Sequence, residues 1–256
     1  MNQQLVQSQF GPQAQKYVDS ADHARSDSLA RVVALLQPQL HWRALDIATG
    51  GGHTALALAP HVAEVVATDI TPAMLAAAEK HIRGQGVANV TFREADAVAL
   101  PFDEAEFDLV TCRVAPHHFP ECAQFVREMA RVLRPGGLAL LIDNVVPADL
   151  AAARHINAIE KLRDPSHNWA HTEADWLDFF ALAGLAVSHH ETFRKVRDFD
   201  NWTGMMSVDP HTKTQLRTLF LQAPAAASAA LAPEVLDGRL KFYLTEILLL
   251  ARKPLA

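Results

Sequence analysis

The sequence predicts an α/β fold built on a doubly wound, mostly parallel sheet. Three observations lead to this class. Half of the 256 residues are hydrophobic, which provides enough apolar surface for the core of one globular domain. Short β-branched runs alternate with helical segments, as they do in right-handed βαβ units. The first of these runs ends in an acid and a cluster of glycines, at the point where such sheets bind nucleotide-like ligands.

Seven apolar, β-branched runs predict strands. They lie near 43–47, 64–69, 90–94, 107–112, 138–145, 186–193 and 242–251. Helices are expected near 22–36, 53–59, 72–84 and 120–133, and more helical segments follow position 146. The sequence Pro135-Gly136-Gly137 marks the end of the fourth helix, because proline and glycine both interrupt helical geometry.

The stretch 44–53 is the most informative part of the chain. An apolar run leads to Asp46 and then to a glycine-rich turn. Glycines accept positive φ and let a ligand approach the backbone, where the amides at the start of the next helix are unpaired. Gly50, Gly52 and Ala55 match the dinucleotide pattern G-x-G-x-x-G/A. The same residues also suit a tight strand-to-helix connection that binds nothing.

Two further acids follow predicted strands. Asp69 comes after Asp46 at close to the spacing of about 20 residues that is expected for an acid binding ribose hydroxyls. It also suits the start of the helix at Thr71-Pro72, where an acid favours the helix dipole. Asp96 follows the next strand and is placed to accept a hydrogen bond from an adenine amino group. Because parallel strands end at one edge of a sheet, we expect these carboxylates to lie along a single rim.

Together these residues resemble the class I S-adenosylmethionine-dependent methyltransferases, and more narrowly the small-molecule branch that includes quinone-biosynthesis C-methyltransferases. The resemblance covers about the first two thirds of the chain. Its motifs are the segments 45–52, 68–75, 96–97, 100–102, 107–110 and 128–137. The family implies a Rossmann-like, seven-stranded sheet that ends in an antiparallel last strand, with S-adenosylmethionine as the cofactor.

The resemblance also implies which residues bind that cofactor. Asp46 is expected to orient the turn and the methionine end, and Asp69 to bind ribose. The remaining expected cofactor contacts are Ala48, Thr49, Gly50 and Gly52 along the turn, Ile70 and Met74 on the adenine face, and Asp96 and Ala97 at the adenine edge. Ala48 and Thr49 depart from the family, which usually has Gly and a small residue or Cys there. Neither change blocks approach to the backbone, so we expect binding to survive.

We expect one methyltransferase domain over 1–256, with N-terminal cofactor-covering helices in 1–40, a cofactor-binding core in 41–146 and substrate-side helices with a final hairpin in 147–256. In the first part, Phe10 and Tyr17 are expected to cover the cofactor, although a simple entry helix is the alternative.

An insertion is expected over 198–240. Its apolar residues Phe199, Trp202, Met205 and Met206 suit either a pocket cover or ordinary core packing. The alanine-rich run 223–232 suits a linker or a short helix.

His117 and His118 follow the fourth strand, at the edge where acceptors approach in this family. An imidazole pKa near 6.5 suits a general base, which is needed only if the acceptor must lose a proton, as a phenol or a carbon acid must. The alternative is that these rings shape the pocket without titrating. Arg113 is expected to clamp an anionic acceptor or the cofactor carboxylate, or to pair with a surface acid. Asp143 and Asn144 face the same edge, and their role stays open.

A second polar and aromatic cluster comprises His167, Trp169 and His171. It precedes a helix start at which Thr172 and Asp175 are spaced for reciprocal capping. Capping accounts for this segment without a ligand, and we keep His171 and Trp169 as candidate pocket residues.

Composition disfavours several other functions. The net charge of −6, with no Lys/Arg-rich run, is unlike that of a nucleic-acid binder. No zinc-type spacing appears among the histidines and cysteines, so no metal is expected. No apolar run is long enough to span a bilayer and no secretion signal begins the chain. Cys112 and Cys122 are expected to be reduced thiols, which favours a cytoplasmic protein. The expected partner is a small-molecule acceptor, and the sequence permits a homodimer.

We therefore expect transfer of a methyl group from S-adenosylmethionine to carbon or oxygen of a small apolar or aromatic acceptor, by in-line displacement. Two alternatives remain at this point. A nicotinamide-dependent oxidoreductase would share the glycine turn and Asp69, and a non-transferase protein that binds S-adenosylmethionine would share the whole fold.

Overall fold

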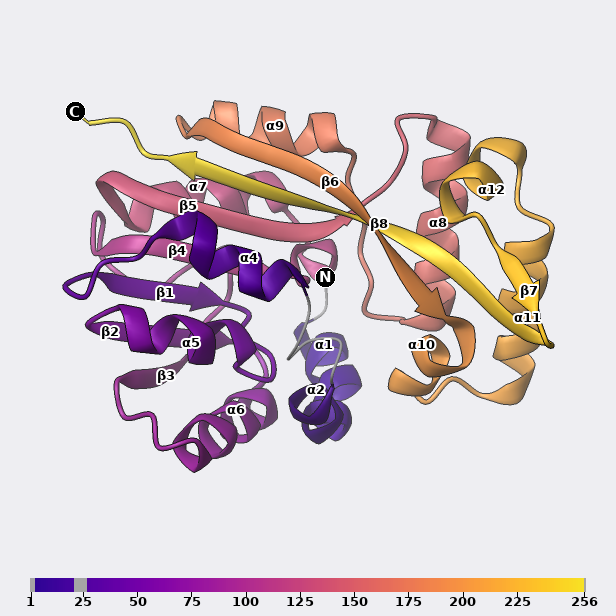
Figure 1. The fold of residues 1–256 in the computed structure, drawn as a ribbon, viewed down its shortest axis with the longest axis horizontal. Helices are drawn as coiled ribbons and strands as arrows, with labels where there is room; N and C mark the ends of the chain where they lie inside the picture. Colours follow the sequence, from indigo (N-terminus) through magenta and orange to yellow (C-terminus); the bar gives the residue numbers. More distant parts are fainter. Residues whose placement is uncertain (1–2, 21–26, 256) are drawn as a thin grey trace.

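A mixed β-sheet runs through the molecule and carries helices on both faces (Figure 1). The computed structural model describes residues 3–20 and 27–255. The order of the seven long strands is β3-β2-β1-β4-β5-β8-β6, and the short β7 (Glu234–Leu236) pairs with β8 alone. The long strands are β1 (Arg43–Ile47), β2 (Glu64–Asp69), β3 (Val90–Glu94), β4 (Phe107–Arg113), β5 (Leu133–Val145), β6 (Ala186–Asp198) and β8 (Arg239–Arg252).

The direction of the strands confirms the predicted sheet. β1 to β5 are parallel to one another, whereas β8 runs antiparallel to both β5 and β6. Three strands are longer than expected, since β5 already begins at Leu133, β6 continues to Asp198 and β8 begins at Arg239. β7 was not expected at all; it forms a hairpin with the start of β8 inside the predicted insertion.

Helices occur at all the predicted places. They are α1 (Gln3–Phe10), α2 (Ala14–Asp19), α4 (Asp27–Leu36), α5 (His53–Leu58), α6 (Pro72–Gly84), α7 (Cys122–Val132), α8 (Leu150–Arg163), α9 (Glu173–Leu182), α10 (Phe199–Met205), α11 (Pro210–Leu221) and α12 (Ala225–Leu231). Positions 22–26 of the first predicted helix lie outside the described residues. The alanine-rich run forms α12, and the expected capping box of Thr172 and Asp175 begins α9.

Alternating side chains bury both faces of the sheet. In β1, Leu45 and Ile47 pack on the face covered by α7 and α9, whereas Ala44 packs on the face covered by α4, α5 and α6. This alternation follows from the two-residue period of a strand. Because both faces are covered, the central strands are apolar almost throughout, and their polar residues gather at the strand ends.

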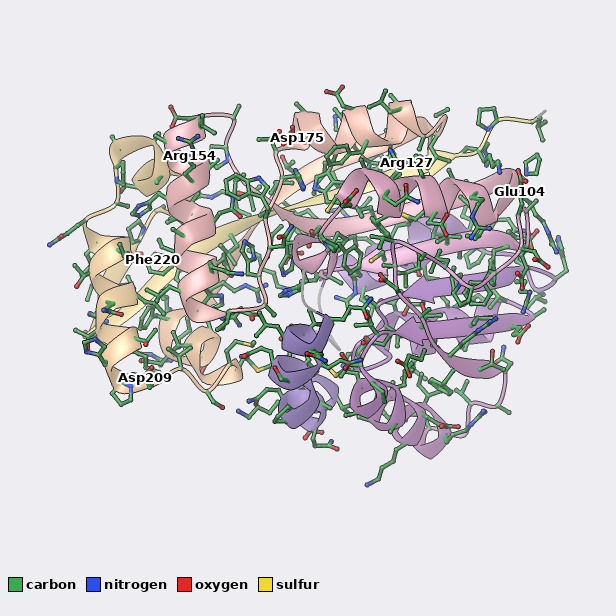
Figure 2. The ribbon with its side chains drawn as sticks, turned by 180° about the vertical axis from the view of Figure 1, so that it is seen from behind. Glu104, Arg127, Arg154, Asp175, Asp209 and Phe220 are labelled. Carbon is green, nitrogen blue, oxygen red and sulfur yellow. The ribbon has the colours of Figure 1, made fainter. Side chains whose placement is uncertain are left out.

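The strands β6 and β8 extend beyond the main sheet and support a second core (Figure 1). Helices α8, α10, α11 and α12 pack there around aromatic side chains, of which Phe220 and Phe242 have ring centroids 4.3 Å apart. Figure 2 shows Phe220 among these helices, and Asp209 at the start of α11, where its carboxylate caps the helix. Phe199 and Trp202 belong to this core, as the packing alternative predicted.

The glycine turn connects β1 to α5 and fixes the distance between α5 and α6. Gly52 is the N-cap of α5 and has a φ of 81°. A Cβ at this position would lie 2.8 Å from Ile82 Cδ1 and 3.1 Å from Ala78 Cβ, both on α6. The turn therefore needs glycine here both for its left-handed backbone and for the close approach of the two helices.

We predict that Gly52→Ala destabilises the protein by about 2–3 kcal/mol, of which about 1–2 kcal/mol comes from the left-handed conformation and about 1 kcal/mol from displaced neighbours. Gly86→Ala is the matched control, since Gly86 has a φ of 76° and an added Cβ would meet nothing within 4 Å. Denaturant unfolding of both variants measures the difference. Equal losses would show that contact with α6 contributes nothing.

Candidate functional site

A cavity of about 810 Å³ opens where β1, β2 and β4 end. One part of its wall, which we call the turn side, comes from the glycine turn and from the chain after β2 and β3, at 46–51, 69–74 and 95–97. The other part, the helix side, comes from the loop after β4 and from α8, α10 and β8, with Asn144 near the end of β5. Helices α1 and α2 border both parts, so the cavity is continuous from one side to the other.

Asp46 ties the turn side together. Thr49 Oγ1 donates to Asp46 Oδ2 at 2.7 Å, and Thr111 Oγ1 on β4 donates to Asp46 Oδ1 at 2.8 Å. The side chain is buried, and burial raises the pKa of Asp46 to about 6, although these two hydrogen bonds act in the opposite direction. Thr49, which departs from the family pattern, thus holds the buried carboxylate to the turn.

Asp69 holds the other end of the turn. Its Oδ2 accepts a hydrogen bond from Gly50 N at 3.0 Å and its Oδ1 accepts one from Thr71 N at 2.9 Å. The second bond is the helix-start role that the sequence offered as an alternative, while the first fixes the glycine turn. Burial raises the pKa of Asp69, and the backbone donors oppose that shift.

The second departure from the family pattern carries a backbone cost. Ala48 has a φ of 52°, in the left-handed region that glycine adopts freely. Its short side chain still leaves the backbone of the turn at the cavity wall. The residue usual at this position in the family, glycine, would adopt this conformation without that strain.

The predicted adenine residues lie together at the far end of the turn side. Ile70, Met74, Asp96 and Ala97 all line the cavity. The N-terminal helix reaches the same place, since Gln3 Nε2 donates to Asp96 Oδ2 at 2.7 Å and Gln7 Nε2 donates to the Ile70 carbonyl at 2.7 Å. The sequence did not indicate either glutamine, because their partners lie more than 60 positions away.

The N-terminal segment places Phe10 and Tyr17 in the cavity wall, and their expected role in covering the cofactor stays a prediction. The Phe10 ring meets the Tyr17 ring edge-on at 5.5 Å and the His118 ring at 5.0 Å. His53 Nε2 lies 3.0 Å from the Tyr17 carbonyl, and Tyr17 Oη donates to Met206 Sδ at 3.6 Å. Burial raises the pKa of Tyr17 to about 12, so the phenol stays neutral. These contacts link α2 to both sides of the cavity.

His117 forms a buried pair with Asp143. Its Nδ1 lies 2.6 Å from Asp143 Oδ1, and because a carboxylate only accepts, Nδ1 is the donor and Nε2 is left as the acceptor of the neutral ring. Burial alone would lower the pKa of His117, but the charge and hydrogen bond of Asp143 outweigh it and raise the pKa. The role left open for Asp143 is therefore that of a partner to this histidine.

His118 lies in a different environment although it is the next residue. Its Nδ1 is 3.3 Å from Ser166 Oγ, whose proton is directed to Asp164 Oδ1 at 2.5 Å. Burial and the neighbouring His117 lower the pKa of His118 to about 3. A ring with so low a pKa binds a proton poorly, so the two candidate bases are not equivalent.

The other candidate residues have separate surroundings. Arg113 lines the cavity, its Nε donates to Thr54 Oγ1 at 3.1 Å, and the charges that most affect its pKa besides burial are Asp46 and Glu246. His167 is buried with Nε2 at 2.8 Å from Asn157 Oδ1. Neither Trp169 nor His171 is among the described residues that line the cavity, and His171 packs instead against Trp176 and Phe179 of α9.

Trp202 and Met205 of α10, which the sequence offered as a possible pocket cover, line the helix side, and Trp202 also packs in the second core. The sequence did not indicate Leu244 of β8, which adds to this apolar wall, or Glu160 and Asp164, which give it buried acids. Glu160 and Asp164 lie four positions apart and so share one side of the helix, but this spacing alone is a weak signal of a binding site.

No cluster of side chains in the described ranges is arranged to hold a metal ion. Within the same ranges, no helix is both long and apolar enough to cross a bilayer.

Comparison with known proteins agrees with this geometry. A family model described as a methyltransferase domain matches residues 45–141. The chain is 35% identical over 193 residues to the uncharacterized methyltransferase YcgJ of Bacillus subtilis (strain 168), a match over 75% of this chain and 76% of that protein. It is 41% identical over 109 residues to the demethylmenaquinone methyltransferase of Deinococcus radiodurans, a match over 41% of this chain and 44% of that protein.

Solved structures extend the similarity to nearly the whole chain. The crystal structure of YcgJ superimposes with a TM-score of 0.86 at 32% identity and covers 90% of this chain and 99% of that one. BH2331 from Bacillus halodurans C-125 superimposes with a TM-score of 0.85 at 39% identity, with the same coverage. The chain belongs to the class I S-adenosylmethionine-dependent methyltransferases. It is an enzyme whose methyl donor is S-adenosylmethionine, so neither of the two alternative functions is retained.

The turn side fits this cofactor. A Cβ added to Gly50 would meet nothing within 4 Å, so the backbone of the turn borders open space in the cavity. The carboxylates of Asp46, Asp69 and Asp96 stand along one rim, where a ligand with an amino group, ribose hydroxyls and an adenine amino group offers matching donors. The residues present therefore suit the cofactor that the family uses.

We predict that Asp69→Asn weakens binding of S-adenosylhomocysteine by about 1–3 kcal/mol, because a charged hydrogen-bond acceptor is lost. Isothermal titration calorimetry measures the change. Glu94→Gln is the matched control, since Glu94 pairs in register with Asp69 at the end of the neighbouring strand but is exposed and outside the cavity wall. Unchanged affinity in Asp69→Asn would remove Asp69 from the binding site.

Proposed function

We propose that this enzyme methylates carbon or oxygen of a small, largely apolar or aromatic acceptor. The observation that supports it most is the continuity of the cavity, which joins the turn side to an apolar wall containing Trp202, Met205 and Leu244. The Deinococcus relative, named a demethylmenaquinone methyltransferase, is consistent with an aromatic acceptor, although its match covers less than half of either chain.

We assign the turn side to the cofactor and the helix side to the acceptor. Asp46 and the backbone of Ala48, Thr49 and Gly50 would hold the methionine end, Asp69 would hold ribose, and Ile70, Met74, Asp96 and Ala97 would hold adenine. Gly52, also expected at the methionine end, does not line the cavity, and its N–H donates to the Thr49 carbonyl at 2.9 Å, so it shapes the turn instead. When bound, S-adenosylmethionine supplies a methyl group on a sulfonium that a nucleophile displaces in line. The chain's own part is to align the acceptor and exclude water, for which Phe10 and Tyr17 lie over the cavity.

His117 is the proposed general base. Its Nδ1 is held by Asp143, so the ring presents Nε2 as the site that takes a proton from a hydroxyl or from carbon of the acceptor. Asp143 also stabilises the imidazolium that forms. His118, with its pKa lowered to about 3, is assigned to packing between Phe10 and Ser166, and Arg113 to the methionine end near Asp46. The free, buried thiols of Cys112 and Cys122 support a reducing, cytoplasmic setting.

A labelled-donor screen tests the acceptor class. The enzyme would be incubated with methyl-labelled S-adenosylmethionine and with pooled small aromatic, aliphatic and polar metabolites. We expect labelled product in the aromatic or apolar pools, extractable into organic solvent. Label confined to polar amines or acids would contradict the proposal.

We predict that Asp143→Asn lowers the pKa of His117 below its ordinary value of 6.5, because burial then acts without the opposing carboxylate. Histidine NMR titration measures it directly. In the native protein, the pair stabilises the fold fully below pH 6.5, and this contribution is lost as the pH rises through the raised pKa of His117 in the folded state.

A general base must be neutral to accept a proton, so we expect activity to rise with pH as His117 loses its proton. Asp143→Asn should move this rise in activity to lower pH.

His117→Gln should reduce kcat by about 100-fold or more while leaving affinity for S-adenosylhomocysteine unchanged. His171→Gln is the matched control, because His171 is half-buried and lies outside the cavity wall. Equal activity of the two variants would assign His117 to pocket shape alone.

A further inference from the structure

Helix α8 turns one polar face toward the cavity and the loop that follows it. Asn157, Glu160 and Asp164 are spaced three and four positions apart, so they share this face. Asn157 and Asp164 have structural partners: Asn157 Oδ1 accepts from Ala170 N at 2.6 Å, and Asp164 Oδ1 accepts from Ser166 N at 2.9 Å. Both side chains hold the loop 164–172 in place.

Glu160 lies between them and lacks such a role. It is only 5% exposed and lines the cavity. Its Oε1 is buried with no hydrogen-bond partner among the described residues, and its Oε2 lies 3.8 Å from Arg163 Nη1, which is beyond hydrogen-bond length. Burial raises the pKa of Glu160, and the charges of Arg163 and His117 are the largest of the opposing influences.

A buried polar atom without a partner is costly, and native proteins keep few of them. Arg163 is an ion-pair partner of Glu160 at 3.8 Å but donates no hydrogen bond to it; its Nε donates instead to the Trp202 carbonyl at 3.1 Å, and its guanidinium stacks 4.7 Å from the centroid of the Trp202 ring. The Glu160 carboxylate is thus an acceptor of hydrogen bonds that the fold leaves unused, beside an aromatic wall and close to His117.

We propose that Glu160 is a specificity-determining residue that binds a hydrogen-bond donor on the acceptor, either a hydroxyl or an amino group attached to an aromatic ring. The proposal rests on the assignment of the helix side to the acceptor. Trp202 offers the ring an apolar face, and Glu160 accepts from its polar substituent. An acceptor that lacks a donor would leave Glu160 Oε1 buried without a hydrogen bond, which is the physical basis of strong discrimination.

The test uses three probes with the same ring: 1-naphthol, 1-naphthylamine and 1-methoxynaphthalene. Their affinities are measured by calorimetry on the full chain saturated with S-adenosylhomocysteine. We expect the wild type to bind 1-naphthol or 1-naphthylamine about tenfold or more tightly than 1-methoxynaphthalene, the size expected for a hydrogen bond to a charged group. The two donor probes distinguish a hydroxyl site from an amino site.

Glu160→Leu should abolish this preference, and Glu160→Gln, which keeps one carbonyl oxygen, should reduce it. Glu104→Gln, on the exposed turn before β4 and outside the cavity wall, removes the same charge and should leave the preference intact. The melting temperature of Glu160→Leu should change little, since the carboxylate makes no hydrogen bond within the described part of the fold and only its 3.8 Å ion pair with Arg163 is lost.

A lower melting temperature with an unchanged preference would make Glu160 a structural ion-pair residue and overturn the proposal. Absence of preference in the wild type, including no binding of any probe, would overturn it as well. Binding of S-adenosylhomocysteine, measured beforehand in the same samples, tests the cofactor assignment separately, and labelled-donor turnover tests the acceptor class. A negative result for Glu160 would therefore leave the cofactor assignment and the acceptor class unaffected.

Discussion

The site depends on one buried carboxylate, that of Asp46. It receives hydroxyl hydrogen bonds from the glycine turn, through Thr49, and from β4, through Thr111. Because β1 and β4 are neighbours in register at Asp46 and Thr111, these bonds fix the turn relative to the strand whose end leads to His117. Asp46 therefore links the glycine turn, where the proposed cofactor contacts lie, to the strand that leads to the proposed base.

Burial gives adjacent residues different chemistry in this cavity. His117 and His118 are consecutive, yet Asp143 raises the pKa of the first while desolvation lowers that of the second. The same contrast holds on α8, where Asp164 is satisfied by the loop and Glu160 is not. Residue type and proximity thus identify candidates, whereas the partners of each polar atom decide between them.

Much of the fold followed from the sequence because its signals are local. Strand and helix periods, the glycine turn and the acids at strand ends identified the sheet and placed Asp46, Asp69 and Asp96 on one rim. The pairing of His117 with Asp143 was harder to foresee, since it depends on β5 lying beside β4 and on side chains 26 positions apart. Glu160 and the glutamines of α1 carried no motif, and only the packing of distant segments reveals their place.

A crystal structure with S-adenosylhomocysteine bound tests the central claim most directly. The claim is that one continuous cavity holds the cofactor on the turn side and faces its sulfur toward His117 on the helix side. We expect ribose on Asp69, adenine between Ile70 and Asp96, and the sulfur directed to the space beside His117. A ligand bound away from the glycine turn, or with its sulfur turned from His117, would contradict this account.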